Sequence, residues 1–342
     1  MYAIQRDIDE IKTSLKPFWK NIEGQRFLIT GGAGFLGSWM CDALLSMGGH
    51  VTCVDNMASG FPKNIEHLKD NKNFRLLRAD ITTFETNEKF DYVIHMASVA
   101  SPPLYQKIPI ETLDAGVIGT KRMLELAVSS KGFLFTSTSE VYGNPPDNMV
   151  PTPETYYGYV NSYGPRSMYD ESKRCAEAYC YSYWKQKNVP VRIARIFNTY
   201  GPRLDAKSPG GYGRALVKFV YQALRNEPIS MYGDGSQTRS FCYVTDQIAG
   251  LVKLLLTPDI DGDVVNIGNE SEITIAELIG KVLKTTNSSS KIVHSEPAYD
   301  LKDDPRRRRP DTKKAKKLLG WTPTISLDEG LKRTAEWMRE VI

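Results

Sequence analysis

The segment RFLITGGAGFLG, residues 26–37, joins a short apolar run to a glycine-rich turn. The run at 26–30 has the length and composition of a buried strand, and apolar residues at helical spacing follow the turn at 39–44. Glycines in the pattern GxxGxxG allow a tight turn, and they let backbone amides approach a pyrophosphate at the positive end of the helix. Strand, turn and helix in this order predict a dinucleotide-binding site. The alternative is a glycine-rich turn that serves only the packing of the chain.

A second expected strand, residues 50–54, ends at Asp55, eighteen residues beyond Gly37. A carboxylate at this place can accept hydrogen bonds from the 2′-hydroxyl of an adenosine ribose, and its charge would repel a 2′-phosphate. The pattern therefore favours NAD over NADP as the cofactor.

The alternation of strands and helices continues along the chain. Apolar runs at 74–79, 92–98, 133–137 and 191–196 predict further strands, and a helix is expected at 118–128. The predicted fold class is α/β, with a doubly wound parallel sheet. Because ligands of such sheets bind at the carboxyl ends of the strands, one edge of the sheet is expected to carry Gly31, Asp55, Asp80, Ala97 and Thr138.

Tyr169 and Lys173 stand four residues apart in an expected helix and so share one of its faces. An ammonium beside a phenol lowers the phenol pKa from its usual value of about 10, and the phenolate can then take a proton from a hydroxyl group. A surface Tyr and Lys on an ordinary helix is the alternative, which this spacing alone would favour. Thr138, Ser139 and Glu140 follow the strand at 133–137 and are the nearest candidates to act with this pair. For Glu140 the alternative is a carboxylate that caps a helix or forms a structural salt bridge.

Composition excludes several classes of protein. The chain has 342 residues, 41% of them hydrophobic, which is enough for a large core and two lobes. Its 44 basic and 40 acidic residues give a net charge of only +4, which is too balanced for a nucleic-acid-binding protein. The five cysteines are scattered and the four histidines form no ligand motif, so we expect no metal site and a reduced, cytoplasmic chain. No run approaches the roughly 20 apolar residues of a membrane span, and the N-terminus lacks the apolar core of a signal peptide.

Residues 1–20 predict a helical extension that precedes the sheet. Ile4, Ile8, Ile11 and Leu15 recur three to four residues apart, and Pro17 follows them. Such a helix is expected to pack on its own domain or on a second copy of the chain.

Five features together resemble the extended short-chain dehydrogenases that act on nucleotide sugars. They are GGAGFLG at 31–37, Asp55, HMAS at 95–98, SEVYG at 139–143 and the YxxxK pair at 169–173. The resemblance covers nearly the whole chain from Gln25 onward. Within this family, the segments ASVASPPLY at 97–105, TSE at 138–140 and GPRSMYDESKR at 164–174 are most similar to UDP-glucuronate decarboxylases, also called UDP-xylose synthases. A dehydratase would show an Asp-Glu pair after the threonine, where this chain has Ser139 before Glu140.

The resemblance implies an NAD-dependent decarboxylation of UDP-glucuronate to UDP-xylose through a 4-keto intermediate, with NAD regenerated in each cycle. Tyr169 would be the base, and Lys173 would lower its pKa and hold the nicotinamide ribose. Thr138 or Ser139 would stabilise the enolate, and Glu140 would act near the C5 proton. Arg308 would bind the sugar carboxylate or supply a proton, with Arg307 or Arg309 as the alternatives.

The resemblance also implies binding residues and partners. Contacts with NAD are expected at Gly31, Gly34, Phe35, Leu36, Gly37, Asp55, Asn56, Asp80, Ile81, Ala97, Tyr169 and Lys173. Contacts with a UDP-sugar are expected at Pro103, Tyr105, Glu140, Asn198, Arg203, Arg239, Tyr243 and Arg308. A homodimer that pairs through the helix carrying Tyr169 is expected, with no nucleic-acid or membrane partner.

The expected domains follow from the same pattern. Residues 21–196 and 236–264 would form an NAD-binding Rossmann domain, and residues 197–235 and 265–342 a smaller nucleotide-sugar-binding lobe. The glycine- and proline-rich residues 207–213 are expected to form a mobile flap.

Four residues depart from the decarboxylase pattern. Glu111 and Asp114 stand where decarboxylases tend to have basic residues, Gly116 stands for a usual asparagine, and Ser172 for a usual glycine. Three alternatives therefore stay open: a C4 epimerase of a uronic acid or neutral sugar, a reductive UDP-sugar enzyme that consumes NADH, and an NAD-binding regulatory protein without catalysis.

Overall fold

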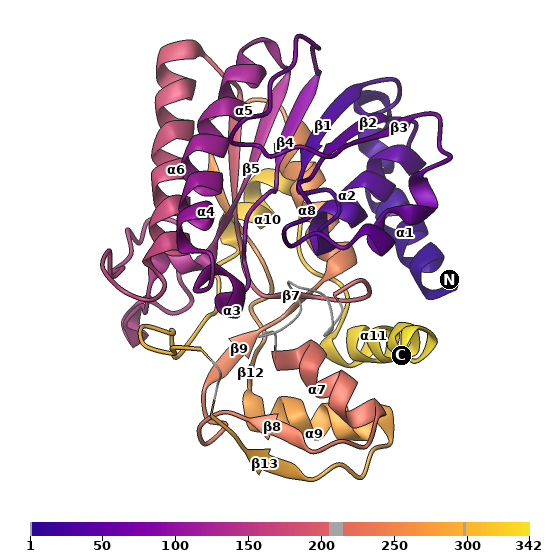
Figure 1. Cartoon of the computed structure of the whole chain (residues 1–342), viewed down its shortest axis with the longest axis vertical. Coiled ribbons are helices and arrows are strands. Elements are labelled where there is room, and N and C mark those ends of the chain that lie inside the picture. The colour runs from indigo at the N-terminus through magenta and orange to yellow at the C-terminus, as the bar shows by residue number, and fades with distance from the viewer. Residues whose placement is uncertain (1, 205–214, 297–298) are drawn as a thin grey trace.

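The computed structural model describes residues 2–204, 215–296 and 299–342 of the chain. The flap expected at 207–213 lies outside these residues. Figure 1 shows two unequal parts, a large sheet covered by helices and a smaller lobe beneath it.

Within the described residues, seven parallel strands form the large sheet, in the order β3-β2-β1-β4-β5-β6-β11. Their bounds are β1 Arg26–Thr30, β2 His50–Val54, β3 Phe74–Leu77, β4 Tyr92–His95, β5 Gly132–Thr138, β6 Val191–Ile196 and β11 Val264–Ile267. The order reverses between β1 and β4, as expected of a doubly wound sheet. The prediction of this fold class is confirmed.

Helices cover both faces of the sheet (Figure 1). One face packs on α4 Pro109–Asp114, the π-helical turn η4 Ala115–Gly119, α5 Thr120–Leu126 and α6 Ser167–Lys187. The other face packs on α2 Phe35–Ser46, α8 Val244–Leu256 and α10 Lys313–Leu319. The short helix α3 Pro102–Tyr105 follows β4 and leads into α4.

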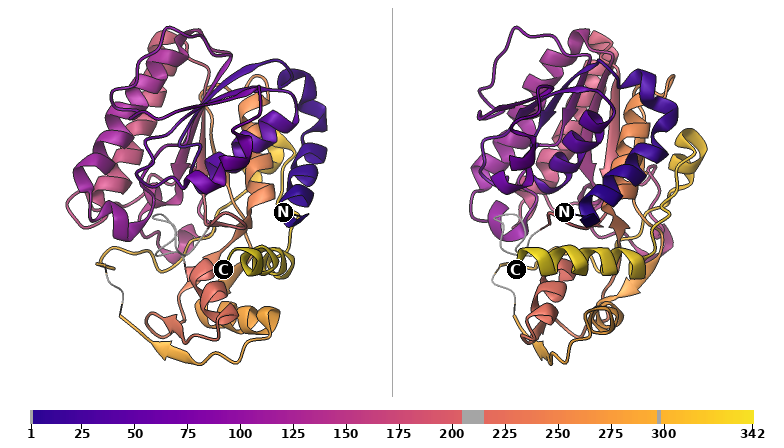
Figure 2. Two further views of the ribbon diagram at one scale, coloured as in Figure 1. Left: turned by 45° about the vertical axis from the view of Figure 1, so that its right-hand side comes forward. Right: turned by 90° about the vertical axis from the view of Figure 1, so that its right-hand side faces the viewer.

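The N-terminal helix α1, Tyr2–Ser14, lies on the α2 and α8 side and is followed by the 3-10 turn η1 Lys16–Asn21 (Figure 2). Ile8, Ile11 and Leu15 are buried there, as their spacing predicts. The helix also contacts α11 Leu327–Val341. It thus packs on its own chain, and it touches both parts of the molecule.

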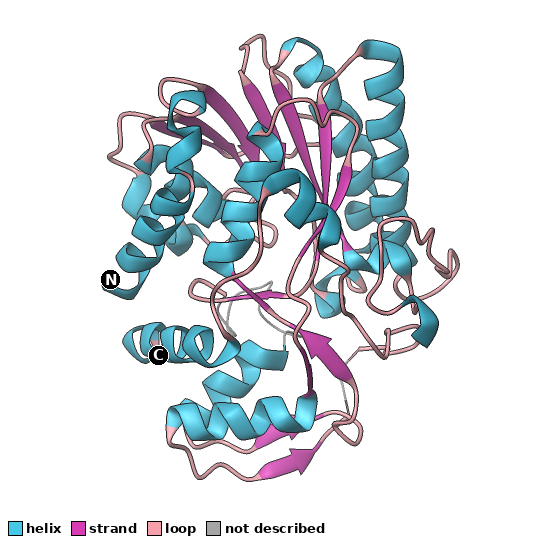
Figure 3. Cartoon of the chain, turned by 180° about the vertical axis from the view of Figure 1, so that it is seen from behind, coloured by secondary structure: helices cyan, strands magenta, loops and turns pink. Residues whose placement is uncertain are grey.

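The smaller lobe contains α7 Ala215–Leu224, α9 Ile275–Thr286 and α11, which pack on one another (Figure 3). Its short strands β8 Ile229–Met231 and β13 Ile292–His294 pair in parallel, and β9 Thr238–Ser240 pairs antiparallel with β12 Glu272–Thr274. A further pair, β7 Thr199–Tyr200 with β10 Cys242–Tyr243, lies where the two parts meet.

Two expected boundaries need correction. The Rossmann segment expected to stop at residue 264 continues to Ile267, because β11 is a full strand of the large sheet paired with β6. Helix α10, which was expected in the small lobe, packs instead on β11 and α8.

Candidate active site

A cavity of about 720 Å³ lies between the carboxyl ends of the sheet strands and the small lobe. Residues from both parts line it, from Gly31 in the glycine turn to Arg308 near the C-terminus. All twelve residues expected to contact a dinucleotide line this cavity, namely Gly31, Gly34, Phe35, Leu36, Gly37, Asp55, Asn56, Asp80, Ile81, Ala97, Tyr169 and Lys173. The expected catalytic residues Thr138, Ser139, Glu140 and Arg308 line it as well.

The glycine turn lies directly against the loop that follows β4. Gly31 has φ +72°, and a Cβ at this position would lie 2.8 Å from the Cα of Ala97. Only glycine combines this backbone conformation with so close an approach. The turn leads into the amino end of α2, whose free N–H groups and positive dipole suit a pyrophosphate. The local structure therefore fits the dinucleotide that the motif predicts.

Two acidic residues at the ends of β2 and β3 hold the loops around this part of the cavity. Asp55 is buried and accepts hydrogen bonds from the backbone N–H groups of Ala33 (2.9 Å) and Met57 (2.8 Å). Burial raises the pKa of the Asp55 carboxyl, against the effect of these two donors. Asp80 accepts a hydrogen bond from the Asn56 amide (2.8 Å), which ties the two loops together.

Tyr169 and Lys173 share one buried face of α6, as their spacing predicts. The Lys173 ammonium donates to the Thr136 carbonyl (2.7 Å) and lies 5.9 Å from the centre of the Tyr169 ring. Burial lowers the pKa of Lys173 to about 8. The ammonium is therefore still mostly protonated at neutral pH, and it lies close enough to favour a Tyr169 phenolate.

Tyr105 covers the other side of the Tyr169 ring. The two rings stack with centroids 5.4 Å apart and an interplanar angle of 4°. The Tyr105 hydroxyl is buried and has no hydrogen-bond partner among the described residues, although the residue lines the cavity. A buried hydroxyl in this situation suits a polar group of a ligand.

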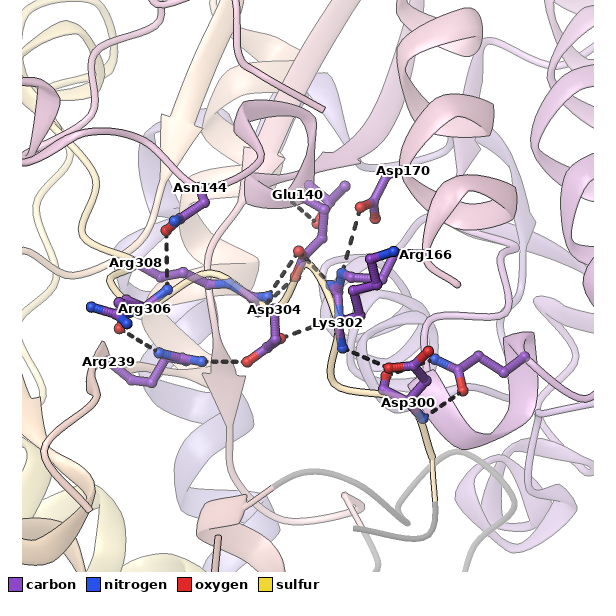
Figure 4. A network of polar contacts seen from close by, with 12 residues as sticks. Glu140, Asn144, Arg166, Asp170, Arg239, Asp300, Lys302, Asp304, Arg306 and Arg308 are labelled. Atoms are coloured by element: carbon purple, nitrogen blue, oxygen red, sulfur yellow. Dashed lines mark hydrogen bonds and ion pairs between the residues drawn. The ribbon is translucent and has the colours of Figure 1, made fainter. Parts of the chain in front are cut away.

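Glu140 lies at the centre of a buried charge cluster (Figure 4). Thr138 ends β5, and its hydroxyl accepts a hydrogen bond from the Glu140 backbone N–H (3.3 Å), which starts the turn η6 Ser139–Tyr142. The Glu140 carboxylate then accepts from Arg166 Nη2 (2.6 Å) and from both terminal nitrogens of Arg308 (2.6 and 2.8 Å). Glu140 therefore does form salt bridges, as the alternative predicts. All three residues of these salt bridges, Glu140, Arg166 and Arg308, nevertheless line the cavity.

Three arginines, Arg166, Arg239 and Arg308, line the cavity and meet at Asp304. Asp170, one residue after Tyr169, lies 3.5 Å from Arg166 Nε. Burial, followed by repulsion from Glu140, raises the pKa of Asp170 to about 8. The cluster thus gathers three cations and three acidic groups beside the expected base (Figure 4).

Neighbouring arginines near the C-terminus lie in different surroundings. Among residues 307–309, Arg308 lines the cavity. Arg307 pairs with Glu272 (2.7 Å) and Asp147 (3.0 Å) instead. Asn198, Tyr105 and Arg239 also line the cavity, as expected of residues that contact the substrate.

Three expected substrate residues are placed differently. Tyr243 is fully buried outside the cavity lining, and its hydroxyl donates to Asp7 of α1 (2.6 Å). Pro103 does not line the cavity, whereas its neighbour Pro102 does. Arg203 lines the cavity, but its guanidinium pairs with Asp42 (2.5 Å) and covers the Trp39 ring. Asp7 and Asp42 lie far away in sequence, so no local pattern indicated these pairings.

Sequence reasoning missed Arg166, Asp170 and Asp304 as members of the site. Arg166 and Asp170 belong to the segment GPRSMYDESKR, in which roles were expected only for Tyr169 and Lys173. Arg166 and Asp170 stand four residues apart, the spacing of an ion pair on one helix face, and this is the signal that could have found them. Asp304 stands two residues before Arg306, and no comparable local spacing indicates its partners Arg166 and Arg239.

Two of the residues that depart from the decarboxylase pattern touch each other. A Cβ at Gly116 would lie 2.5 Å from both the Cβ and the Oγ of Ser172. The small residue in η4 and the larger one in α6 thus compensate in volume. Glu111, a third departure, lines the cavity from α4.

Within residues 2–204, 215–296 and 299–342, no group of His, Cys, Asp and Glu side chains is arranged to hold a metal ion. None of the helices described is long and apolar enough to cross a bilayer.

The chain is similar to a family of known proteins over most of its length. Residues 28–334 match the family model described as GDP-mannose 4,6 dehydratase. The chain is 45% identical over 322 residues to UDP-glucuronic acid decarboxylase 1 of Danio rerio, which covers 94% of this chain and 74% of the relative. It is 45% identical over 311 residues to UDP-glucuronic acid decarboxylase 4 of Arabidopsis thaliana, at 90% and 67% coverage.

Solved structures are similar over almost the same length. The UDP-glucose 4-epimerase of Thermotoga maritima, solved with UDP-glucose, is 31% identical with a TM-score of 0.82 and covers 92% of this chain and 99% of its own. The UDP-glucuronic acid 4-epimerase of Bacillus cereus, solved with UDP-glucuronic acid and NAD, is 29% identical with a TM-score of 0.79, at 93% and 100% coverage.

Proposed function

The chain belongs to the family described as GDP-mannose 4,6 dehydratase, whose members share the extended short-chain dehydrogenase fold, and we propose that it decarboxylates UDP-glucuronate to UDP-xylose. One observation carries this proposal: Tyr169 and Lys173 face the same cavity as Glu140 and Arg308, beside a turn that fits a dinucleotide. Curated relatives that are 45% identical over 94% and 90% of this chain are named UDP-glucuronic acid decarboxylases.

Tyr169 acts as the base in this proposal. Its phenolate takes the proton from the 4-hydroxyl of the sugar, and the Lys173 ammonium stabilises that phenolate by charge. NAD, when bound, supplies the acceptor for the hydride of C4 and returns it later in the same cycle. Gly31 and Asp55 belong to the residues that would hold it, with Asp55 toward the adenosine ribose.

Decarboxylation needs charge control around the sugar. A ketone at C4 is beta to the carboxylate and accepts the electron pair of the breaking carbon–carbon bond, so carbon dioxide leaves and an enolate forms. Hydroxyl groups of Thr138, Ser139 and the reprotonated Tyr169 would donate to the enolate oxygen. Arg308 would hold the sugar carboxylate and Arg239 the diphosphate, because guanidinium groups suit both anions. Glu140 would orient Arg308 near C5, where the enolate takes up a proton and the 4-ketone is restored. Tyr169 would then return its proton to O4 as C4 is reduced.

The proposal extends to assembly and compartment. The cysteines of the described residues are all free thiols, which supports a reducing, cytoplasmic environment. Helix α4 and turn η4, which pack on α6, expose Ile110 (71%), Leu113 (42%) and Ile118 (43%). We call these three side chains the α4 patch. An exposed apolar patch of this kind supports a homodimer that pairs across α4 and α6.

The test is to incubate the purified chain with UDP-glucuronate, without added reductant, and to follow the nucleotide sugar by mass spectrometry. Loss of carbon dioxide to give a UDP-pentose is the expected result. Tyr169→Phe should lower kcat by about 10²-fold or more, because the base is lost. Tyr163→Phe is the matched control, since Tyr163 is 95% exposed. A product of unchanged mass but altered retention would point instead to a uronate 4-epimerase, the reaction named for the Bacillus cereus neighbour.

A further inference from the structure

Asp304 forms ion pairs with three of the arginines that line the cavity, Arg166, Arg239 and Arg308 (Figure 4). Its Oδ1 lies 3.2 Å from Nη1 of Arg166 and 3.2 Å from Nη2 of Arg308. Its Oδ2 lies 2.8 Å from Nη2 of Arg239. The carboxylate itself lines the cavity, and its side chain is 28% exposed. The Asp304 side chain is thus more exposed than those of Arg166 (4%), Arg239 (13%) and Arg308 (13%).

The three arginines keep their orientation through other contacts. Glu140 accepts from Arg166 (2.6 Å) and from Arg308 (2.6 and 2.8 Å), and these distances are shorter than the 3.2 Å pairs with Asp304. Arg239 donates to the backbone carbonyls of Thr238 (2.8 Å) and Arg306 (3.0 Å). Asp304 thus contributes mainly charge, while Glu140 and two carbonyl groups contribute the geometry.

Asp304 is the acidic partner that balances the charge of Arg239. Among the described residues, Asp304 is the carboxylate within ion-pair distance of Arg239. Burial and repulsion by Arg308 lower the pKa of Arg239 to about 10. Burial alone would raise the pKa of Asp304, but Arg308, Arg239 and Arg166 together hold it below its usual value. Both groups are therefore ionised at neutral pH.

We propose that Asp304 is an internal counter-ion that competes with the anionic groups of the ligand for Arg239 and Arg308, and so determines how strongly the cavity binds anions. A ligand that uses these guanidinium groups has to displace the Asp304 carboxylate or share the arginines with it. The identity of that ligand as a nucleoside diphosphate sugar rests on the proposed function. The competition itself requires only an anion at the arginines.

The test compares Asp304→Asn with the unchanged chain by isothermal titration with UDP. Asparagine keeps the shape of the side chain and removes its charge, so UDP should bind about fivefold to tenfold more tightly, within the usual range of coupling between two sites. Affinity for uridine, which carries no phosphate, should not change. The affinity of Asp304→Asn for UDP should also fall more steeply with added salt than that of the unchanged chain. The reason is that the variant leaves one more positive charge without an acidic partner.

Asp303→Asn is the matched control. Asp303 is the adjacent residue, its carboxylate accepts from Asn161 (2.8 Å), and it does not line the cavity. Its substitution should leave UDP affinity unchanged. If circular dichroism shows that Asp304→Asn is unfolded, Asp304→Ser, which is also neutral, replaces it in the titration. Unchanged or weaker UDP binding by the folded neutral variant would overturn the proposal, because Asp304 would then only position the arginines.

The same titration separates this inference from the proposed function. Suppose that Asp304→Asn binds UDP more tightly but the unchanged chain leaves UDP-glucuronate intact. The counter-ion proposal would then stand and the decarboxylase function would be rejected. If the unchanged chain decarboxylates UDP-glucuronate but Asp304→Asn binds UDP no more tightly, the function would stand and the counter-ion proposal would be rejected.

Discussion

Gly116 and Ser172 show how two residues of unusual size can form one packing unit. The absence of a side chain at Gly116 lets η4 approach α6 at Ser172, next to Lys173. Ser172 Oγ also donates to the carbonyl of Tyr169 (2.8 Å). The contact therefore lies at the turn of α6 that carries Tyr169 and Lys173.

We predict that Gly116→Asn destabilises the fold by about 1–3 kcal/mol through overpacking and lowers kcat. Ser172→Gly in the same chain should restore most of both losses, because it removes the atoms that the asparagine would meet. Urea unfolding and kcat of the two single variants and the double variant measure the coupling, expected at about 1–2 kcal/mol. Additive effects would mean that the two residues do not share one space.

We predict that the stability and the activity of the chain both depend on pH through Lys173. Its pKa, ordinarily 10.5, is lowered to about 8 by burial, so the folded chain releases this proton before the unfolded chain does. The cost of burying the ammonium is present below pH 8 and is relieved as the pH rises from 8 to 10.5. Activity should fall in the same direction as the ammonium beside Tyr169 is lost. The rate kcat/KM against pH should show an alkaline limb near 8.

The stability of Lys173→Met provides a second measurement that does not depend on turnover. This variant has a similar shape but no proton to lose. In urea unfolding between pH 8 and 10.5, its stability relative to the unchanged chain should therefore decrease as the pH rises. A constant difference across that range would mean that Lys173 titrates normally.

At the level of the elements, local patterns were sufficient wherever the apolar spacing alone decides the structure. Strands β1, β2 and β6 have the expected bounds. The single helix expected at 118–128 is instead divided: residues 118–119 belong to η4, residues 120–126 to α5, and residues 127–128 to the 3-10 turn η5 Ala127–Ser129. The close contact of Gly116 with Ser172 of α6 is a tertiary cause of this division, and the apolar spacing along the sequence does not show it. The Thr120 hydroxyl also donates to the Gly116 carbonyl (2.6 Å), a local contact one helical turn apart.

The same limit applies to the candidate site. The glycine turn, Asp55 and the Tyr169–Lys173 pair could be predicted because each motif is short and has a chemical reason. Tyr243 could not be placed, because its partner Asp7 is 236 residues away. Asp304 could not be recognised for a similar reason, because its partner Arg239 lies 65 residues earlier in the sequence.

Helix α1 is held by a buried charged residue near its middle as well as by apolar packing. Asp7 is 0% exposed and accepts hydrogen bonds from Tyr243 (2.6 Å) and Arg333 Nη1 (2.7 Å). Asp7→Ala should destabilise the chain by about 3 kcal/mol, because it leaves buried polar partners unsatisfied. Asp9→Ala on the exposed side of the same helix is the control and should change stability little. Thermal unfolding of both variants tests this, and equal values would remove the special role of Asp7.

For the whole molecule, the proposed homodimer gives a prediction about the α4 patch. A double substitution Ile110→Glu and Leu113→Glu places two charges where apolar contacts between copies are expected. It should therefore give a monomer in size-exclusion chromatography with light scattering. Ile292→Glu, which is 46% exposed in β13 of the small lobe, should leave the mass unchanged. A monomeric unchanged chain, or a double variant that still dimerises, would contradict the pairing across α4 and α6.

The contact between α1 and α11 has a consequence for how the protein is made. Asp7 and Arg333 are separated by 326 residues, so their ion pair closes only after almost all of the chain has emerged from the ribosome. Until then, Ile8, Ile11 and Leu15 have no complete surface to cover them, although they belong to the earliest translated part of the fold. A nascent chain with an early amphipathic helix and a late partner remains exposed to aggregation throughout translation. The yield of soluble protein should thus depend on the rate of translation and on chaperones more than its final stability suggests.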